Sequence, residues 1–297
     1  MDIQILAQKF YQHSTVVRGY SKDTIRRYKY VISFYCKYSG IQNINQVTDA
    51  NLRALFLYGR TERNWKPNTY ICFHKSLLVF FRWCVSQGVL ASNPIEGMEK
   101  PKLESRVAPK LTRQDSLRLL ETVNNYPYDN PYLRYRNHAI FSTFIFAGLR
   151  KQELLKLKYT DVDVENLSIF VRQGKGNKDR IIPMTYTLAQ SLKLYLEHRK
   201  KINRTCPEFF ASLNRNHGYT DSGLKRLVIQ LRRASGIVFT VHKLRHTFAT
   251  LMLEGGCDIY SLSRMMGHSD IITTSRYLFA SAELLRSQMI KHPLNNA

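Results

Sequence analysis

Acidic residues, long apolar runs and cysteine pairs are all scarce in this chain of 297 residues. Asp and Glu number 22 against 45 Lys and Arg, so the formal net charge is +23 and the isoelectric point is near 9.9. An excess of this size indicates a polyanionic partner and predicts an affinity that falls steeply with salt. No apolar run approaches the about 18 residues of a membrane span, so we expect no membrane anchor.

The cysteines are too few and too scattered for a disulfide framework or a cysteine-rich metal site. Their number is odd and no two form a CxxC pair. No signal peptide is recognisable at the start of the sequence. Reduced thiols are therefore expected, and with them a cytoplasmic, nucleoid-associated protein. The five are Cys36, Cys72, Cys84, Cys206 and Cys257.

Basic charge is present in both halves of the chain, at +9 up to residue 107 and +14 beyond it. Neither half is therefore a mere charged tail. Two compact basic halves favour a nucleic-acid clamp over a uniformly positive surface.

The first hundred residues carry helical patterns. Ser21 can cap a helix with apolar residues three and four apart that stops at Gly40, and Thr48 can cap a second helix. A third is expected over 68–87. The stretch NPIEGMEKPKLESRVAPKLT has three prolines and no period, which suits a connection between domains. We expect a helical domain with its linker over 1–107 and a second domain over 108–297.

The second half predicts further helices and one β-hairpin. Thr112 can open a helix, and an apolar helix over 139–146 leads into Gly148. LSIFVRQ and RIIPM alternate around the turn GKGNKD and predict the hairpin. The expected fold is mainly α with a small β-sheet (α+β). Later helices are expected over 187–201, 221–235, 241–254, 258–266 and 271–290.

The stretch VHKLRHTFAT places His242 and Arg245 on one helical face, with His246 four residues after His242. A metal site would use the two histidines. It lacks the glutamate of HExxH and has no cysteine or carboxylate nearby in sequence, so no metal is expected. A histidine hydrogen-bonded within the fold is the simpler interpretation of His246. The same interpretation suits the pair of His242 and Arg245 less well.

Three other short stretches could contribute to a site. Arg150 follows a helix end and has Glu153 one turn on, where a carboxylate could hold the guanidinium. Lys175 lies in the hairpin turn, and MGHSDIITTSRYL places His268 nine residues before Tyr277. Tyrosine occurs 18 times here, so Tyr277 is notable only through its neighbours.

Taken together, the motifs AGLRKQEL, GKGNKDR, HKLRH and MGHSDIITTSRYL resemble, in order and separation, those of the tyrosine recombinase family of phage integrase and Xer type. SLLVFFRWCVSQGVLASNP resembles the core-binding domain of that family, so the likeness covers nearly the whole chain. Gln152 and Met266, where the family often has Ser and Leu, are conservative departures.

The resemblance implies a catalytic set. Tyr277 would attack a DNA phosphodiester to give a 3′-phosphotyrosine, with no metal or cofactor because the bond energy is kept in the intermediate. Arg150 and Arg245 would bind the phosphate, and Lys175 would act as general acid. His242 would be the acid/base for the tyrosine hydroxyl, and His268 would hydrogen-bond the phosphate. Glu153 would support Arg150, while His246 and Phe248 would face inward.

The resemblance also implies an assembly. Two domains would form a C-shaped clamp on double-stranded DNA with short inverted repeats. Four protomers would exchange strands through a Holliday junction, with a second recombinase or an accessory protein as further partners. The tail after Tyr277 would dock on a neighbouring protomer or on its own domain.

The short build favours a recombinase of the Xer or transposon-resolvase kind, for dimer or cointegrate resolution. The alternative is an integrase or excisionase of a mobile element. Two other classes fit less well: a non-catalytic DNA-binding protein would not need the six-residue set, and a type IB topoisomerase would not need the Xer-like layout.

Overall fold

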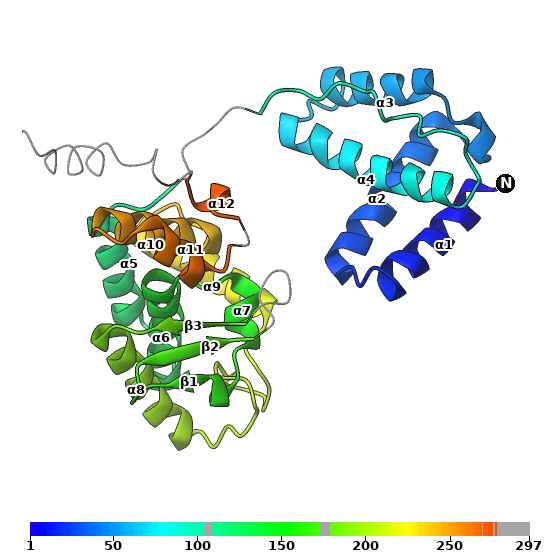
Figure 1. The fold of residues 1–297 in the computed structure, drawn as a ribbon. Helices are drawn as coiled ribbons and strands as arrows, with labels where there is room; N and C mark the ends of the chain where they lie inside the picture. Colours follow the sequence, from blue (N-terminus) through cyan, green and yellow to red (C-terminus); the bar gives the residue numbers. More distant parts are fainter. Residues whose placement is uncertain (104–108, 173–178, 269, 276, 278–297) are drawn as a thin grey trace, which may run out of the picture. The chain divides into compact units, whose positions relative to one another are not determined.

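The computed structural model describes residues 1–297 except 104–108, 173–178, 269, 276 and 278–297. The chain divides into two compact units, Met1–Ser105 and Arg106–Ala297 (Figure 1). Each has a hydrophobic core of its own. Most described residues are helical and one small sheet lies in the second unit, which confirms the expected fold class.

The first unit is a four-helix bundle around an aromatic core. Ser21 and Thr48 cap the second and third helices as expected, since each side chain accepts a backbone N–H of the first turn. The first helix was not predicted, although Asp2 accepts two backbone N–H groups at its start. Buried Phe10, Phe80 and Phe81 lie in the core. The helices are α1 (Ile3–Val16), α2 (Lys22–Ser39), α3 (Asp49–Thr61) and α4 (Pro67–Ser86).

The second unit is built around one buried helix. α6 (Pro131–Ala147) has buried residues on all sides because it contacts α5 (Arg113–Asn125), α8 (Tyr186–Lys201) and α10 (Val241–Glu254). A helix that is buried on every side is typical of such a central position. The other helices are α7 (Lys151–Lys156), α9 (Asp221–Ser235), α11 (Ile259–Met266) and α12 (Ile272–Ser275).

The predicted hairpin is present as β2 (Ser168–Val171) and β3 (Arg180–Pro183). The strands are antiparallel, and Ile169 pairs with Ile182, both buried. A third strand, β1 (Val162–Asp163), pairs with β2 and was not predicted because two residues are too short to show alternation. The turn that contains Lys175 lies outside the described residues.

Only the start of the helix expected over 271–290 falls within the described part of the chain, where α12 covers four residues. All five cysteines are free, with Cys72 and Cys257 half-buried and the other three buried. Among the described residues, no helix is long and apolar enough to cross a membrane, and no group of three or more His, Cys, Asp or Glu side chains could hold a metal ion.

Candidate active site

The turn between α6 and α7 places Arg150. Gly148 ends α6 with φ of +60°, a conformation that L side chains rarely adopt, and a Cβ there would lie 2.2 Å from Phe248 Cδ1. The chain can therefore turn sharply here only with glycine. Arg150 then stands at the N-cap of α7, one turn before Glu153.

The Glu153 carboxylate lies at the centre of an arginine cluster. Its Oε1 accepts from Arg150 Nη1 at 2.7 Å, and its Oε2 accepts the Arg150 backbone N–H at 2.8 Å. Arg180 donates to both oxygens, at 2.9 and 2.8 Å, and Arg245 Nη1 lies 4.0 Å from Oε2. Glu153 as support for Arg150 was a prediction, and this ion pair places the two side chains together.

Glu153 is ionised despite its burial. Burial by itself would raise the pKa of its carboxyl, but the hydrogen bonds and charges of Arg180, together with hydrogen bonds from Arg150, lower that pKa to about 2. One fixed negative charge therefore offsets part of the repulsion among three guanidinium groups. The cluster keeps a net positive charge.

Sequence reasoning missed Arg180, the last residue of the quoted motif GKGNKDR. Its side chain is 8% exposed and forms a bidentate ion pair with Glu153, which is 27 residues away in sequence. One signal in the sequence could have indicated this role of Arg180. It is the first residue of β3, next to a charged turn, where the alternation of the strand points its side chain inward.

The C-terminal end of α11 provides a second set of acceptors for the same three arginines. Arg180 Nε donates to Met265 O, Arg245 Nη2 to Met266 O, and Arg150 Nη2 to Gly267 O, at 2.6 to 2.8 Å. The last carbonyls of a helix have no partner within it and carry partial negative charge. α11 thus gathers guanidinium groups from three different elements.

Arg245 is buried on α10, and its Nη1 also donates to Gly148 O at 2.5 Å. Burial, and then the nearby Arg150 guanidinium, lower the pKa of Arg245 to about 9. The side chain therefore remains a cation at neutral pH. A phosphate group next to it would relieve this cost.

His268 connects this cluster to α12. Its Nε2 lies 3.3 Å from Arg245 Nη2, and its Nδ1 lies 2.7 Å from Thr274 Oγ1. A guanidinium can only donate, so Nε2 accepts and the proton is on Nδ1, which donates to Thr274. In this state His268 Nε2 is not a donor, and it becomes one to a phosphate either in the other neutral tautomer or as an imidazolium.

Tyr277 is 1% exposed and packs in a small apolar cluster with Phe248, Leu253 and Leu262. Its hydroxyl oxygen lies 2.7 Å from Nδ1 of His246. Sequence reasoning expected His242 at this hydroxyl and His246 within the fold. Half-buried His246 is indeed bonded within the fold, and its partner is this hydroxyl, whereas His242, one turn earlier on α10, is exposed. The role of His242 at the hydroxyl stays a prediction.

Four members of the predicted set, Arg150, Arg245, His268 and Tyr277, thus lie together in one region of the second unit. Arg150 and Arg245 share Glu153 and α11, His268 bonds Arg245, and Tyr277 bonds the residue after Arg245. Of this set, Lys175 lies outside the described residues.

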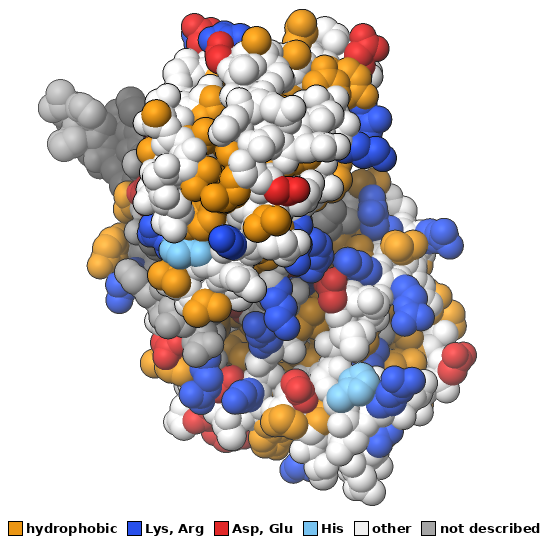
Figure 2. All heavy atoms as spheres, turned by 90° about the vertical axis from the view of Figure 1, so that its right-hand side faces the viewer, with side chains coloured by type: hydrophobic (Ala, Val, Ile, Leu, Met, Phe, Trp, Pro, Cys, Tyr) orange, Lys and Arg blue, Asp and Glu red, His pale blue; other side chains and the backbone are white. Residues whose placement is uncertain are grey.

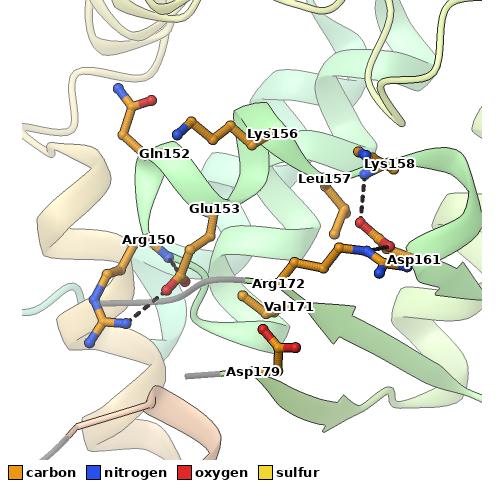
Figure 3. A pocket seen from close by; sticks show the side chains of 10 residues that line it. All are labelled: Arg150, Gln152, Glu153, Lys156, Leu157, Lys158, Asp161, Val171, Arg172 and Asp179. Atoms are coloured by element: carbon orange, nitrogen blue, oxygen red, sulfur yellow. Dashed lines mark hydrogen bonds and ion pairs between the residues drawn. The ribbon is translucent and has the colours of Figure 1, made fainter. Parts of the chain in front are cut away.

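A cavity of about 550 Å³ opens beside the arginine cluster. Figure 3 shows Arg150 and Glu153 on its wall and the Asp161 carboxylate next to Arg172. Exposed Lys156 and Lys158 also line it. On the face shown in Figure 2, Lys and Arg side chains are spread over the surface and Asp and Glu are sparse. Such surroundings suit an extended polyanion.

Comparison with known proteins agrees with this geometry. The phage integrase family matches residues 109–283, and the N-terminal SAM-like domain of phage integrases matches residues 6–89. Tyrosine recombinase XerA of Thermococcus kodakarensis is 31% identical over 94% of this chain and 92% of its own length. Tyrosine recombinase XerD of Listeria monocytogenes is 30% identical over 92% and 93%.

Solved structures show the same fold. A XerA recombinase structure is 25% identical with a TM-score of 0.55, and the match covers 98% of both chains. The Tn1549 transposon integrase, solved with transposon right end DNA, has a TM-score of 0.74 at 21% identity over 97% of this chain and 98% of that one. With motifs, site geometry and both halves of the sequence in agreement, the chain belongs to the phage integrase family of tyrosine recombinases.

Proposed function

We propose that this protein is a Xer-like site-specific recombinase that cleaves and rejoins double-stranded DNA through a 3′-phosphotyrosine on Tyr277. The observation that carries the proposal is the convergence of Arg150, Arg180 and Arg245 on one carboxylate and one helix end, with Tyr277 held beside them. Fixed cations around a net positive centre suit a phosphodiester whose negative charge increases during attack.

The proposed reaction exchanges one ester for another. The Tyr277 oxygen forms a bond to phosphorus, the bond to the 5′-oxygen breaks, and the departing oxygen takes a proton from Lys175. Arg150 and Arg245 stabilise the non-bridging oxygens through paired N–H donors. His242 accepts the tyrosine proton in the DNA-bound state, and a protonated His268 donates to the phosphate. A free 5′-hydroxyl from a second strand reverses the step.

The burial of Tyr277 adds a step to the proposed reaction. A phosphodiester is much larger than water, so it cannot reach a side chain that is 1% exposed to water. Tyr277 must therefore leave its apolar cluster before it attacks.

The proposal includes an assembly on DNA. The first unit is the core-binding domain and the second is the catalytic domain, together forming a clamp on short inverted repeats, with four protomers acting through a Holliday junction. Support comes from similar structures: a lambda integrase tetramer bound to a Holliday junction and XerH bound to palindromic difH. Free cysteines along the whole chain suit action on DNA in the cytoplasm.

The proposed biological role is resolution of DNA dimers or cointegrates, as the similarity to XerA and XerD over nearly the whole chain favours. The second candidate is integration or excision of a mobile element, favoured by the similarity in fold to the Tn1549 integrase. A two-site assay separates resolution from integration, because resolution acts on two sites in one DNA molecule, whereas integration joins sites in two molecules.

The test of the reaction uses a suicide DNA substrate nicked beside the cleavage position, drawn from sequence flanking the gene. Wild-type protein should give an adduct that survives denaturation, and Tyr277→Phe should give none. Tyr260→Phe, which alters a tyrosine that is 64% exposed, should still form the adduct. An adduct with Tyr277→Phe would contradict the proposal. Tight binding of the wild-type protein to the nicked substrates without any adduct would also contradict it.

A further inference from the structure

We infer that His246 is a positioning residue for Tyr277, and that its Nδ1 accepts the tyrosine hydroxyl proton in a hydrogen bond that holds the side chain in its buried resting place. The two atoms lie 2.7 Å apart, a normal length for a good hydrogen bond. The ring centroids are 5.5 Å apart at 51°, so the rings meet at an angle and do not stack.

The need for such a partner follows from the surroundings of Tyr277. The ring packs among Phe248, Leu253, Leu262 and Met266, which offer its hydroxyl no side-chain hydrogen bond apart from weak acceptance by sulfur. A buried hydroxyl without a partner is costly, so the apolar cluster by itself would hold a tyrosine poorly. His246, on α10, supplies a hydrogen-bond partner for this hydroxyl.

The main chain before Tyr277 is held from the same helix. Thr274, which is fully buried, bonds His268, and His268 accepts from Arg245. The Tyr277 backbone N–H donates to Thr274 O at 3.0 Å. Two consecutive residues of α10 therefore hold the nucleophile segment at two points, Arg245 through His268 and His246 directly.

This arrangement divides the work of α10. Arg245 belongs to the proposed phosphate site. The hydrogen bond between His246 and the Tyr277 hydroxyl sets how long the Tyr277 side chain stays buried. Release of the His246 contact is then a step that precedes attack. The inference rests on the proposed function for its importance, but its geometry can be tested without DNA.

The test measures how fast tetranitromethane nitrates Tyr277 in the full-length protein, with each tyrosine followed by peptide mass spectrometry. Tyr186, which is 83% exposed, and Tyr35, which is fully buried, serve as internal standards for fast and slow reaction. Wild-type Tyr277 should react slowly, like Tyr35. His246→Ala should raise its rate on the order of tenfold, since one hydrogen bond to a buried group is lost.

Two conservative variants separate positioning from packing. The amide of His246→Asn places an acceptor near the position of Nδ1, and the longer His246→Gln places it near Nε2. Slow nitration of Tyr277 in the Asn variant and fast nitration in the Gln variant would support the inference. This comparison also holds if His246→Ala fails to fold, which Tyr35 would reveal by reacting as fast as Tyr186.

The inference would be overturned by equal Tyr277 rates in the Asn and Gln variants, or by fast nitration in the wild type. A failed DNA cleavage assay with the nitration pattern intact would reject the proposed function and leave the role of His246 in place.

Discussion

At the scale of single residues, the Glu153 carboxylate determines whether three guanidinium groups can share one small volume. Its side chain is 7% exposed and pairs with Arg150 and Arg180. Removal of one partner of a buried ion pair leaves uncompensated charge, which costs far more than loss of an exposed pair. The site therefore depends on a residue that does not itself contact the scissile phosphate in the proposed reaction.

Glu153→Gln should lower the free energy of unfolding by about 3 kcal/mol, because three buried or half-buried cations then lack their counter-charge. Urea unfolding at pH 7 measures this. The matched control is Glu165→Gln, which removes a surface pair with Lys193 and should change the free energy by less than about 1 kcal/mol. Equal effects in the two variants would show that the arginine cluster does not need its carboxylate.

The same residue predicts a dependence on pH. The pKa of Glu153 is about 2 in the folded protein against 4.5 ordinarily, so its ionised form stabilises the fold above about pH 4.5. That contribution is lost as the pH falls from 4.5 towards 2. The difference in unfolding free energy between wild type and Glu153→Gln should therefore shrink between pH 4.5 and 3, as urea titrations at both values would show. A constant difference would mean that the carboxylate is not the group being protonated.

At the scale of elements, the site exists because helix ends meet. α6 ends at Gly148, α11 ends at Gly267, and both ends have positive φ. The Gly148 carbonyl and the α11 carbonyls accept from arginines that lie far apart in sequence. The geometry of these ends, more than that of the helices between them, fixes where the cations lie.

Gly148→Ala tests one of these ends. The new Cβ would clash with the Phe248 ring and lie in a left-handed conformation. We therefore expect the free energy of unfolding to fall by about 2 kcal/mol or more, as urea unfolding would measure. Gly236→Ala has a similar φ of +69° but nothing within 4 Å of its Cβ. It should cost only about 1 kcal/mol, the price of the backbone strain alone. A similar loss in both would mean that Phe248 moves aside easily.

Local signals in the sequence were sufficient to predict the capped helices α2, α3 and α5 and the β2–β3 hairpin, since caps and alternation act between near neighbours. Contacts between distant segments were not accessible in this way. Nothing local distinguishes His246 from His242, which share a helical face, as the partner of a tyrosine 31 residues away. Arg180 was missed for the same reason, because its partner Glu153 belongs to another motif.

At the scale of the whole molecule, the net charge of +23 governs the long-range attraction between the protein and DNA. Lys and Arg side chains that contact phosphates release the counterions bound to DNA, so affinity falls as salt rises. The buried arginine cluster contributes only a few of these charges, and the rest are distributed over both units.

DNA affinity should therefore fall by about a thousandfold or more between 50 and 200 mM salt, as expected for a protein that neutralises several phosphates. Fluorescence anisotropy with a labelled duplex measures this over the salt range. Replacing exposed Lys156 and Lys158 with Gln should make the salt dependence less steep without affecting the fold. A flat response in the wild type would contradict the clamp.

The distribution of thiols has a practical consequence for following this molecule in action. Each unit carries one half-buried cysteine, Cys72 in the first and Cys257 in the second, while the remaining three are buried. Burial raises the pKa of Cys36 to about 11 and that of Cys84 to about 12, and it also raises the pKa of Cys257. The contrast in labelling therefore comes from exposure, since a dye cannot reach the three buried thiols. Maleimide dyes should therefore label the natural sequence at one place in each unit. Energy transfer between the dyes would then report, one molecule at a time, whether adding DNA changes the separation of the two units.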